Sequence, residues 1–193
     1  MIRAAMLGWC GVFLLGASAF AQSTTQAVSQ TKPADDFVRG TWSVTLDGAY
    51  AHSFITSPAR IETGNIGVGY YVMDHVALNL EAAGFADQQP GKDAIISDLD
   101  ILLRHHVWVQ DRFSLFLDVG GGLTYATHPI PNYATYFNFL AEAGIGATWR
   151  LQDNFYLIGG GRWLHFSNAA LKGPDRNPST NALEGYVGVM FTF

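Results

Sequence analysis

The sequence has very little cysteine, with one residue, Cys10, in a chain of 193. Cys10 lies within residues 1–21, a segment with an early positive charge at Arg3, an apolar run and a small-residue end. These features are typical of a secretory signal peptide that is cleaved off. The predicted mature chain, residues 22–193, therefore has no thiol for a disulfide, for a cysteine-ligated metal or for nucleophilic catalysis.

Charged residues are also scarce, and basic residues are the scarcest. Charged residues of both signs together make up 14% of the chain, with 11 Lys and Arg against 16 Asp and Glu. Loss of Arg3 leaves 10 basic and 16 acidic residues, a net charge of −6, so we expect no nucleic-acid partner. After residue 21 the sequence lacks the run of roughly 18 apolar residues that a membrane-spanning helix needs.

The sequence is instead 49% hydrophobic and 13% aromatic, with 21 glycines. An outer-membrane β-barrel places its apolar residues at every second position rather than in runs. We therefore predict an all-β fold, an eight-stranded antiparallel transmembrane β-barrel over residues 40–193, after a polar lead-in over residues 22–39. The period-2 segments that predict its strands are residues 41–49, 64–72, 76–82, 98–104, 113–119, 137–145, 155–167 and 183–193.

The connections between the predicted strands alternate in length. Three are short, and the four between them are longer and contain Pro or Gly. Short periplasmic turns and longer outer loops are typical of outer-membrane barrels, so we expect both termini on the periplasmic side. The terminal Phe193 is the aromatic last residue expected of such a barrel. The short turns are residues 73–74, 110–112 and 152–154, and the loops are around 53–60, 87–94, 127–135 and 169–180.

Several charged residues fall on the predicted inner faces of the strands and resemble a catalytic cluster. We interpret them as interior charges that pair with one another, because a barrel of eight strands is filled by side chains. The glycine triplets 120–122 and 159–161 lack a following Lys-Ser/Thr and more simply relieve crowding between strands. The inner charges are Glu81, Asp98, Asp100, Arg104, Asp118, Glu142 and Arg162.

His165 differs from the other five histidines, because it lies two residues before Ser167 on one face of the seventh predicted strand. Arg162 lies on the other face, and a cation on the lipid side costs about 2–4 kcal/mol near the midplane. We therefore expect Arg162 to point inward and the His165–Ser167 pair outward, near the outer leaflet. Two polar residues at a strand end are one interpretation, and a serine nucleophile with its base is the other.

The sequence around this pair reads RWLHFSNAAL over residues 162–171 and NPSTNAL over residues 177–183. Upstream, FNF at 137–139 and SDLD at 97–100 belong to the middle strands. These segments, and His-x-Ser-Asn-Ala above all, resemble the lipid A 3-O-deacylase (PagL) family. The resemblance implies an outer-membrane barrel with a Ser-His-acid/amide site on its lipid-facing wall. Such an enzyme removes the ester-linked acyl chain at the 3-position of lipid A.

The resemblance implies that Ser167 is the nucleophile, His165 its general base and Asn168 the oxyanion-hole residue. The third catalytic member, best known as glutamate in the family, aligns with Asn181, and Glu184 is the alternative carboxylate. Alternation on the eighth strand turns Asn181 outward beside His165, and turns Glu184 inward unless a bulge intervenes. We favour Asn181, because an amide oxygen can still orient the imidazole tautomer.

The expected protein is thus a serine-dependent carboxylic ester hydrolase of the Gram-negative outer membrane that uses no metal or cofactor. Lipopolysaccharide is its expected substrate, outer-membrane lipids surround it, and it is a monomer or homodimer. Two alternatives stay open: a phospholipase A-like esterase and a non-enzymatic structural or adhesive barrel. Lys172 and Arg176 in the last loop either meet phosphate or are simply solvated. Ala170 replaces a glycine that is frequent in the family and would narrow the oxyanion site.

Overall fold

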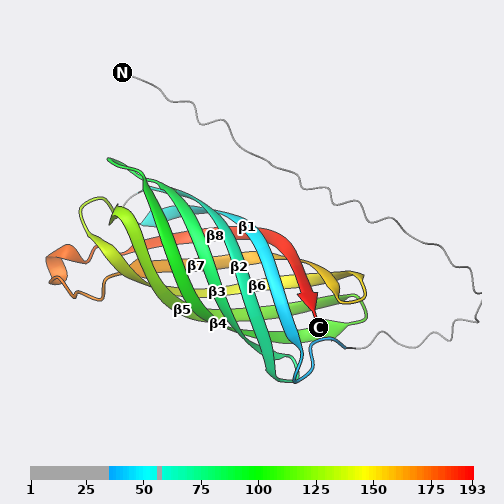
Figure 1. Cartoon of the computed structure of the whole chain (residues 1–193). Helices are drawn as coiled ribbons and strands as arrows, with labels where there is room; N and C mark the ends of the chain where they lie inside the picture. The colour runs from blue at the N-terminus through cyan, green and yellow to red at the C-terminus, as the bar shows by residue number, and fades with distance from the viewer. Residues whose placement is uncertain (1–34, 56–57) are drawn as a thin grey trace, which may run out of the picture. The chain divides into compact units, whose positions relative to one another are not determined.

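The structure is a computed structural model that describes residues 35–55 and 58–193. Every strand pairs antiparallel with its neighbours in sequence, and β1 pairs with β8 to close the barrel (Figure 1). The predicted eight-stranded antiparallel fold is confirmed, whereas the predicted signal peptide, residues 1–21, lies outside the described residues. The strands are β1 Trp42–Ile55, β2 Arg60–Met73, β3 Val76–Gln88, β4 Ala94–Gln110, β5 Phe113–Ile130, β6 Thr135–Gln152, β7 Phe155–Ser167 and β8 Thr180–Thr192.

The barrel is apolar outside and polar inside, as the alternation predicts. In β4, the side chains of Leu99, Ile101 and Leu103 face outward and are 53%, 60% and 39% exposed. Their neighbours Asp98 and Asp100 are buried in the interior. Successive side chains of a strand point to opposite faces, so one strand supplies both surfaces. This distribution fits a barrel whose outer wall contacts hydrocarbon.

The middle of the interior is a layer of paired charges. Arg104 donates two hydrogen bonds to the carboxylate of Asp118, each 2.9 Å long. Arg162 lies 3.1 Å from a carboxylate oxygen of Glu81 and 3.4 Å from one of Glu142. All five side chains are buried. Five of the seven inner charges thus form an ion-pair network, as interpreted from the sequence, whereas Asp98 and Asp100 are buried without taking part in an ion pair.

Apolar side chains fill the interior on both sides of the charged layer, so the barrel has a packed core rather than a pore. The cluster toward the long loops includes Ile61, Phe85, Ile96, Ile130, Leu140, Leu164 and Phe166. The cluster toward the short turns includes Phe37, Tyr71, Phe116, Tyr156, Ile158, Tyr186 and Met190.

The two ends of the barrel differ. The three tight turns and the C-terminus lie at one end, and the β7–β8 loop with its short 3₁₀ helix η1, Pro174–Arg176, lies at the other (Figure 1). The strands continue beyond the predicted segments at the loop end, where β4 begins at Ala94 and β5 ends at Ile130. Backbone pairing persists there after the outer side chains cease to be regularly apolar, so the periodicity underestimates strand length.

The described end of the predicted lead-in closes the turn end of the barrel. The ring of Phe37 is 3% exposed and stacks on His106 with a centroid separation of 4.0 Å. It also contacts the rings of Tyr71 and Tyr156, and the Tyr156 hydroxyl donates a hydrogen bond to Asp36. The polar composition of this segment gave no sign of the packing.

The glycines of residues 120–122 lie within β5 where neighbouring backbones approach closely. A Cβ at Gly120 would lie 2.5 Å from the carbonyl oxygen of Ile101, and one at Gly122 would lie 2.6 Å from the Cα of Asp100. No side chain is accommodated at such distances. The triplet is therefore a packing feature of the sheet, as the sequence interpretation has it.

Candidate active site

The register of β7 and β8 places His165 directly opposite Asn181. The Nδ1 atom of His165 and the Oδ1 atom of Asn181 are 2.9 Å apart, a hydrogen bond. Because an amide oxygen only accepts, the bond places the proton on Nδ1 and leaves Nε2 as the basic nitrogen. The ring of Trp163 stacks on the imidazole from the same strand, with a centroid distance of 5.5 Å. The imidazole is therefore held on two sides.

His165 and Ser167 lie on the outer wall of the barrel. Leu157 and Trp163, on the same face of β7, are 43% and 38% exposed, and His165 and Ser167 are half-buried. Arg162, on the opposite face, is buried among the carboxylates of the interior. The predicted orientation of the strand is therefore found in the structure.

Ser167 is the last residue of β7 and pairs with Phe139 of β6. Along a strand, residues two apart have Cα atoms roughly 6.6 Å apart and side chains on one face. Among the hydrogen bonds of residues 35–55 and 58–193, none joins His165 to Ser167. The pair therefore shares a face at a spacing from which the imidazole can reach the hydroxyl on substrate binding, since catalytic hydrogen bonds often tighten only then.

Glu184, the alternative third member, lies on the inner face of β8. It is opposite Arg162 in the strand register and accepts a hydrogen bond of 3.3 Å from the hydroxyl of Thr63. Its side chain is buried, with 7% exposed. The structure thus brings Asn181, and not Glu184, to the outer face that carries His165.

Asn168 begins the β7–β8 loop and is almost fully buried. Its side-chain amide donates to the hydroxyl of Thr135 at 3.0 Å and to the carbonyl oxygen of Arg176 at 2.5 Å. Its backbone N–H donates to the side-chain oxygen of Asn177 at 2.9 Å. These bonds fix the turn after Ser167 but occupy both amide hydrogens of Asn168. To accept a hydrogen bond from this side chain, an oxyanion would have to displace either the Thr135 hydroxyl or the Arg176 carbonyl oxygen.

The two residues after Asn168 have left-handed backbone conformations, with φ of 50° at Ala169 and 59° at Ala170. Non-glycine residues in this region are strained by roughly 1–2 kcal/mol each. The N–H of Leu171 returns to the carbonyl oxygen of Asn168 at 3.1 Å and closes the turn. Strain of this kind is found at active sites more often than elsewhere. Here the strain begins two residues after Ser167, the candidate nucleophile.

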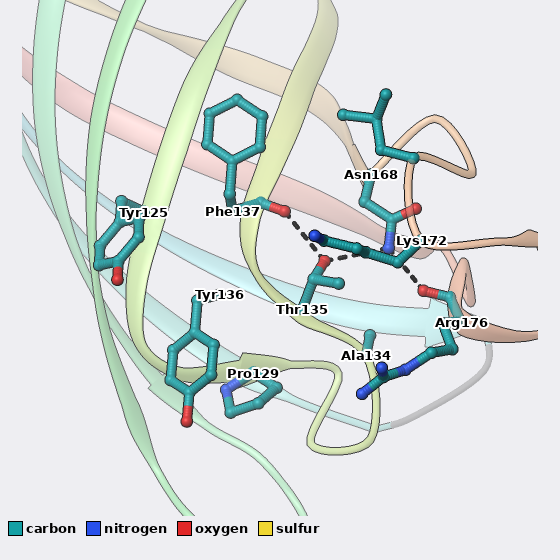
Figure 2. Close-up of a pocket in the computed structure, with 10 residues that line it drawn as sticks. Tyr125, Pro129, Ala134, Thr135, Tyr136, Phe137, Asn168, Lys172 and Arg176 are labelled. Atoms are coloured by element: carbon teal, nitrogen blue, oxygen red, sulfur yellow. Dashed lines mark hydrogen bonds between the residues drawn. The ribbon is translucent and has the colours of Figure 1, made fainter.

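A pocket of about 530 Å³ opens beside this turn, between the β5–β6 and β7–β8 loops (Figure 2). One wall is aromatic and apolar, and the other carries Asn168 and two cationic residues from the β7–β8 loop. In Figure 2 the side chains of Lys172 and Arg176 extend toward the β6 side of the pocket. The lining residues are Tyr125, Pro129, Ala134, Thr135, Tyr136, Phe137, Asn168, Leu171, Lys172 and Arg176.

The part of the chain that the structure describes holds no group of three or more His, Cys, Asp or Glu side chains placed to bind a metal ion. Nor does any helix in residues 35–55 and 58–193 have the length and apolarity to cross a bilayer.

A family model described as lipid A 3-O-deacylase (PagL) matches residues 101–190. The match begins within β4, ends within β8 and includes His165, Ser167, Asn168 and Asn181. Over residues 101–190 the chain is thus similar to the PagL family. The resemblance inferred from the sequence is confirmed. At the level of the family, the activity is deacylation of lipid A, an ester hydrolysis.

Solved structures share the fold at low sequence identity. Neisserial surface protein A (NspA) is 16% identical with a TM-score of 0.64, over 80% of this chain and all of that one. The outer membrane enzyme PagL is 16% identical with a TM-score of 0.54, over 74% of this chain and 97% of that one. OprG of Pseudomonas aeruginosa is 11% identical with a TM-score of 0.54, over 83% and 99%. No curated protein matches the sequence.

The protein is a β-barrel of the Gram-negative outer membrane, as predicted. In such barrels the short turns face the periplasm and the longer loops face outward. His165, Ser167 and the pocket are at the loop end, where β7 ends and the β7–β8 loop begins. The candidate site thus lies at the end of the barrel expected to face outward, on the outer side of the wall.

Sequence reasoning did not find Thr135 or the pocket. Thr135 is 32 residues before Ser167, and it joins the site only because β6 and β7 are neighbours and Asn168 reaches across. The conformations of the two loops follow no periodicity. The one available signal was composition, because aromatic residues lie on the strands that flank the β5–β6 loop, and Lys172 and Arg176 lie in the β7–β8 loop.

Proposed function

We propose that this barrel hydrolyses the ester-linked acyl chain at the 3-position of lipid A, within the outer leaflet, by a Ser167–His165–Asn181 mechanism. The observation that carries the proposal is the 2.9 Å hydrogen bond from His165 to Asn181 on the lipid-facing wall. A polar pair at this position, two residues from a serine on the same face, supplies a base with a fixed tautomer. The match of residues 101–190 to the lipid A 3-O-deacylase (PagL) family model supports lipid A as the substrate.

The proposed reaction has two steps. In the first, the Ser167 hydroxyl attacks the ester carbonyl while Nε2 of His165 takes its proton, and the sugar hydroxyl leaves after receiving that proton. In the second, a water molecule attacks the acyl-enzyme and His165 again accepts and returns a proton. The fatty acid is released and Ser167 is restored. No metal or redox partner enters either step.

Asn181 orients the imidazole in this scheme, and it stabilises the imidazolium less than a carboxylate would. The turn at Asn168 supplies the oxyanion donors. Either its side-chain amide exchanges the Arg176 carbonyl for the oxyanion, or the backbone N–H groups of Ala169 and Ala170 serve. Fixed donors in this position are the largest contribution to catalysis in acyl transfer.

The two alternatives predict different substrates. A phospholipase A-like esterase would use the same three side chains on a glycerophospholipid, and a structural barrel would cleave neither lipid. The barrels NspA and OprG show that this fold alone does not define an activity. Assay of the purified barrel on phospholipid and on lipopolysaccharide, each with and without chelator, distinguishes the three.

The expected result is release of one fatty acid from lipopolysaccharide, little from phospholipid and no effect of chelator. Ser167→Ala and His165→Ala should each abolish release while the heat-modifiable mobility of the folded barrel is kept. Ser97→Ala and His105→Ala are matched controls, because both residues lie on the outer wall of β4. Loss of activity in the controls, or its survival in Ser167→Ala, would refute the mechanism.

A further inference from the structure

The pocket beside Ser167 has a position that fits the head of a lipid rather than its chains. Phe139 pairs with Ser167, and Phe137, two residues nearer the β5–β6 loop, lines the pocket and pairs with Tyr125. The pocket is therefore on the loop side of Ser167, farther from the membrane centre. The outer wall on the other side of Ser167 carries Trp163 and Leu183, both exposed apolar residues.

The two charged residues that line the pocket are both cations. Lys172 and Arg176 are exposed residues of the β7–β8 loop, and both line the pocket. No carboxylate within the described residues lies within 4.0 Å of either cationic group. Two cations that protein carboxylates do not neutralise, beside one hollow, are complementary to an anion. Arginine and lysine are the side chains that bind phosphate oxygens.

The opposite wall of the pocket is suited to a sugar ring. Tyr125 and Tyr136 stack with their ring centroids 6.5 Å apart and an interplanar angle of 25°. Both are exposed, so their faces and hydroxyls are open to a ligand. Aromatic rings with a polar tip are favoured at the membrane surface. A sugar packs its C–H groups on such rings and hydrogen-bonds at its edge.

The pocket is also coupled to the turn that holds Ser167. Thr135 lines the pocket, accepts a hydrogen bond from the Asn168 side chain and donates one of 2.9 Å to the carbonyl oxygen of Phe137 (Figure 2). Asn168 in turn donates to the backbone of Arg176. A ligand held by the pocket is thus positioned relative to the nucleophile through two hydrogen-bonded residues.

We propose that this pocket binds the phosphorylated glucosamine head of lipid A, with Lys172 and Arg176 on the phosphate and Tyr125 and Tyr136 against the sugar. This assignment rests on the proposed function, since it supplies the recognition for the same site. The acyl chains then extend from Ser167 along the outer wall by Trp163. The pocket makes phosphate the feature by which the enzyme distinguishes its substrate from other acyl esters of the leaflet.

The test compares lipid A that carries phosphate with lipid A of the same acyl chains from which phosphate has been removed. Purified barrel in detergent micelles is assayed for kcat/KM as wild type, Lys172→Ala and Arg176→Ala. Lys92→Ala is the matched control, because Lys92 is an exposed cation of a different outer loop, β3–β4. Each pocket variant should lose about tenfold in kcat/KM on the phosphorylated lipid, as removal of one charge-assisted contact predicts.

On the dephosphorylated lipid, the wild type and both variants should fall to one common level, below that of the variants on the phosphorylated lipid, because neither Lys172 nor Arg176 then has a phosphate to contact. The control should match the wild type on both lipids. An equal loss on both lipids, or no loss on either, would overturn the proposal. A loss that follows acyl-chain length and not phosphate would show that the pocket takes an acyl chain instead.

Failure of the proposed function has a separate signature. If the wild type releases no fatty acid from any lipid A, binding is measured by native mass spectrometry of the Ser167→Ala barrel with intact lipid A. Retention of phosphorylated lipid A that is lost in Lys172→Ala would then support the pocket without the reaction. Equal retention of the two lipids would refute the pocket as well.

Discussion

The hydrogen bond between His165 and Asn181 allows the third catalytic position to be tested with a graded series of side chains. Asn181→Asp keeps an oxygen in the position that now lies 2.9 Å from Nδ1 and adds a negative charge. Asn181→Leu keeps the size and removes the acceptor. The two variants change the same contact in opposite directions, so the proposed role predicts opposite effects on the rate of acyl release.

The magnitudes follow from the contact. A hydrogen bond to an ionised partner contributes about 1.5–3 kcal/mol, and a neutral one about 0.5–1.5 kcal/mol. The extra stabilisation of the imidazolium by Asp is therefore about 1–1.5 kcal/mol, or roughly tenfold in kcat. Loss of the acceptor in Asn181→Leu leaves the tautomer unfixed and should lower kcat about 100-fold, the lower end of a general-base contribution.

The assay is fatty-acid release from lipid A by purified, folded barrel, normalised to the folded fraction. This normalisation matters because Asn181 is buried and a carboxylate there carries a desolvation cost. Glu184→Gln is the discriminating control, since Glu184 lies on the inner face, and its rate should stay within about twofold of the wild type. A large loss of fatty-acid release in Glu184→Gln, or equal rates of release for Asn181→Asp and Asn181→Leu, would refute the role proposed for Asn181.

Three further substitutions test the turn after Ser167, the charged interior and the packing of Phe37 at the turn end of the barrel. Ala170→Gly should raise stability by about 1 kcal/mol because it relieves a left-handed φ of 59°, seen as a higher Tm. Arg162→Met should lower the free energy of unfolding by about 3–5 kcal/mol, measured in urea, because Glu81 and Glu142 lose their shared cation. Phe37→Ala should lower the same quantity by about 3 kcal/mol through lost packing at the turn end.

Matched variants separate these effects from general damage. Ala147→Gly, within β6, should lower stability, because the strand gains nothing from left-handed freedom. Val38 follows Phe37 in the chain and is 38% exposed, so Val38→Ala should change the free energy of unfolding by less than about 1 kcal/mol. A stabilising Ala147→Gly, a neutral Arg162→Met or a Val38→Ala as damaging as Phe37→Ala would contradict the respective explanations.

The sequence was sufficient for the wall of the barrel and for the face on which the candidate site lies. Successive residues of a strand point to opposite faces. Because Arg162 was expected to point inward, His165 and Ser167, at odd-numbered positions of the same strand, were expected to point outward. The same alternation predicted that Asn181 and Glu184 point to opposite faces of the eighth strand. In the register of β7 with β8, Asn181 is opposite His165 and Glu184 is opposite Arg162. Their catalytic roles stay predictions.

The sequence was insufficient where contacts join distant segments without a period. Thr135, at the start of β6, accepts a hydrogen bond from Asn168, just after the end of the neighbouring β7. Phe37 packs on His106 from a segment in which apolar and polar residues do not alternate. The hydrogen bonds that occupy the Asn168 amide could not be anticipated either, because they depend on how the β7–β8 loop folds back over its own start. Such contacts are set by tertiary packing of loops, which short-range pattern does not encode.

The proposed mechanism depends on Ser167, on the outer wall at the loop end of the barrel, as the nucleophile that deacylates lipid A. Mass spectrometry of lipid A from cells that produce the wild type or Ser167→Ala at equal levels of folded barrel tests it directly. Lipid A from cells with the wild type should lack one hydroxyacyl group, and lipid A from cells with the variant should be intact. Intact lipid A with both proteins, or the shortened form with both, would contradict it.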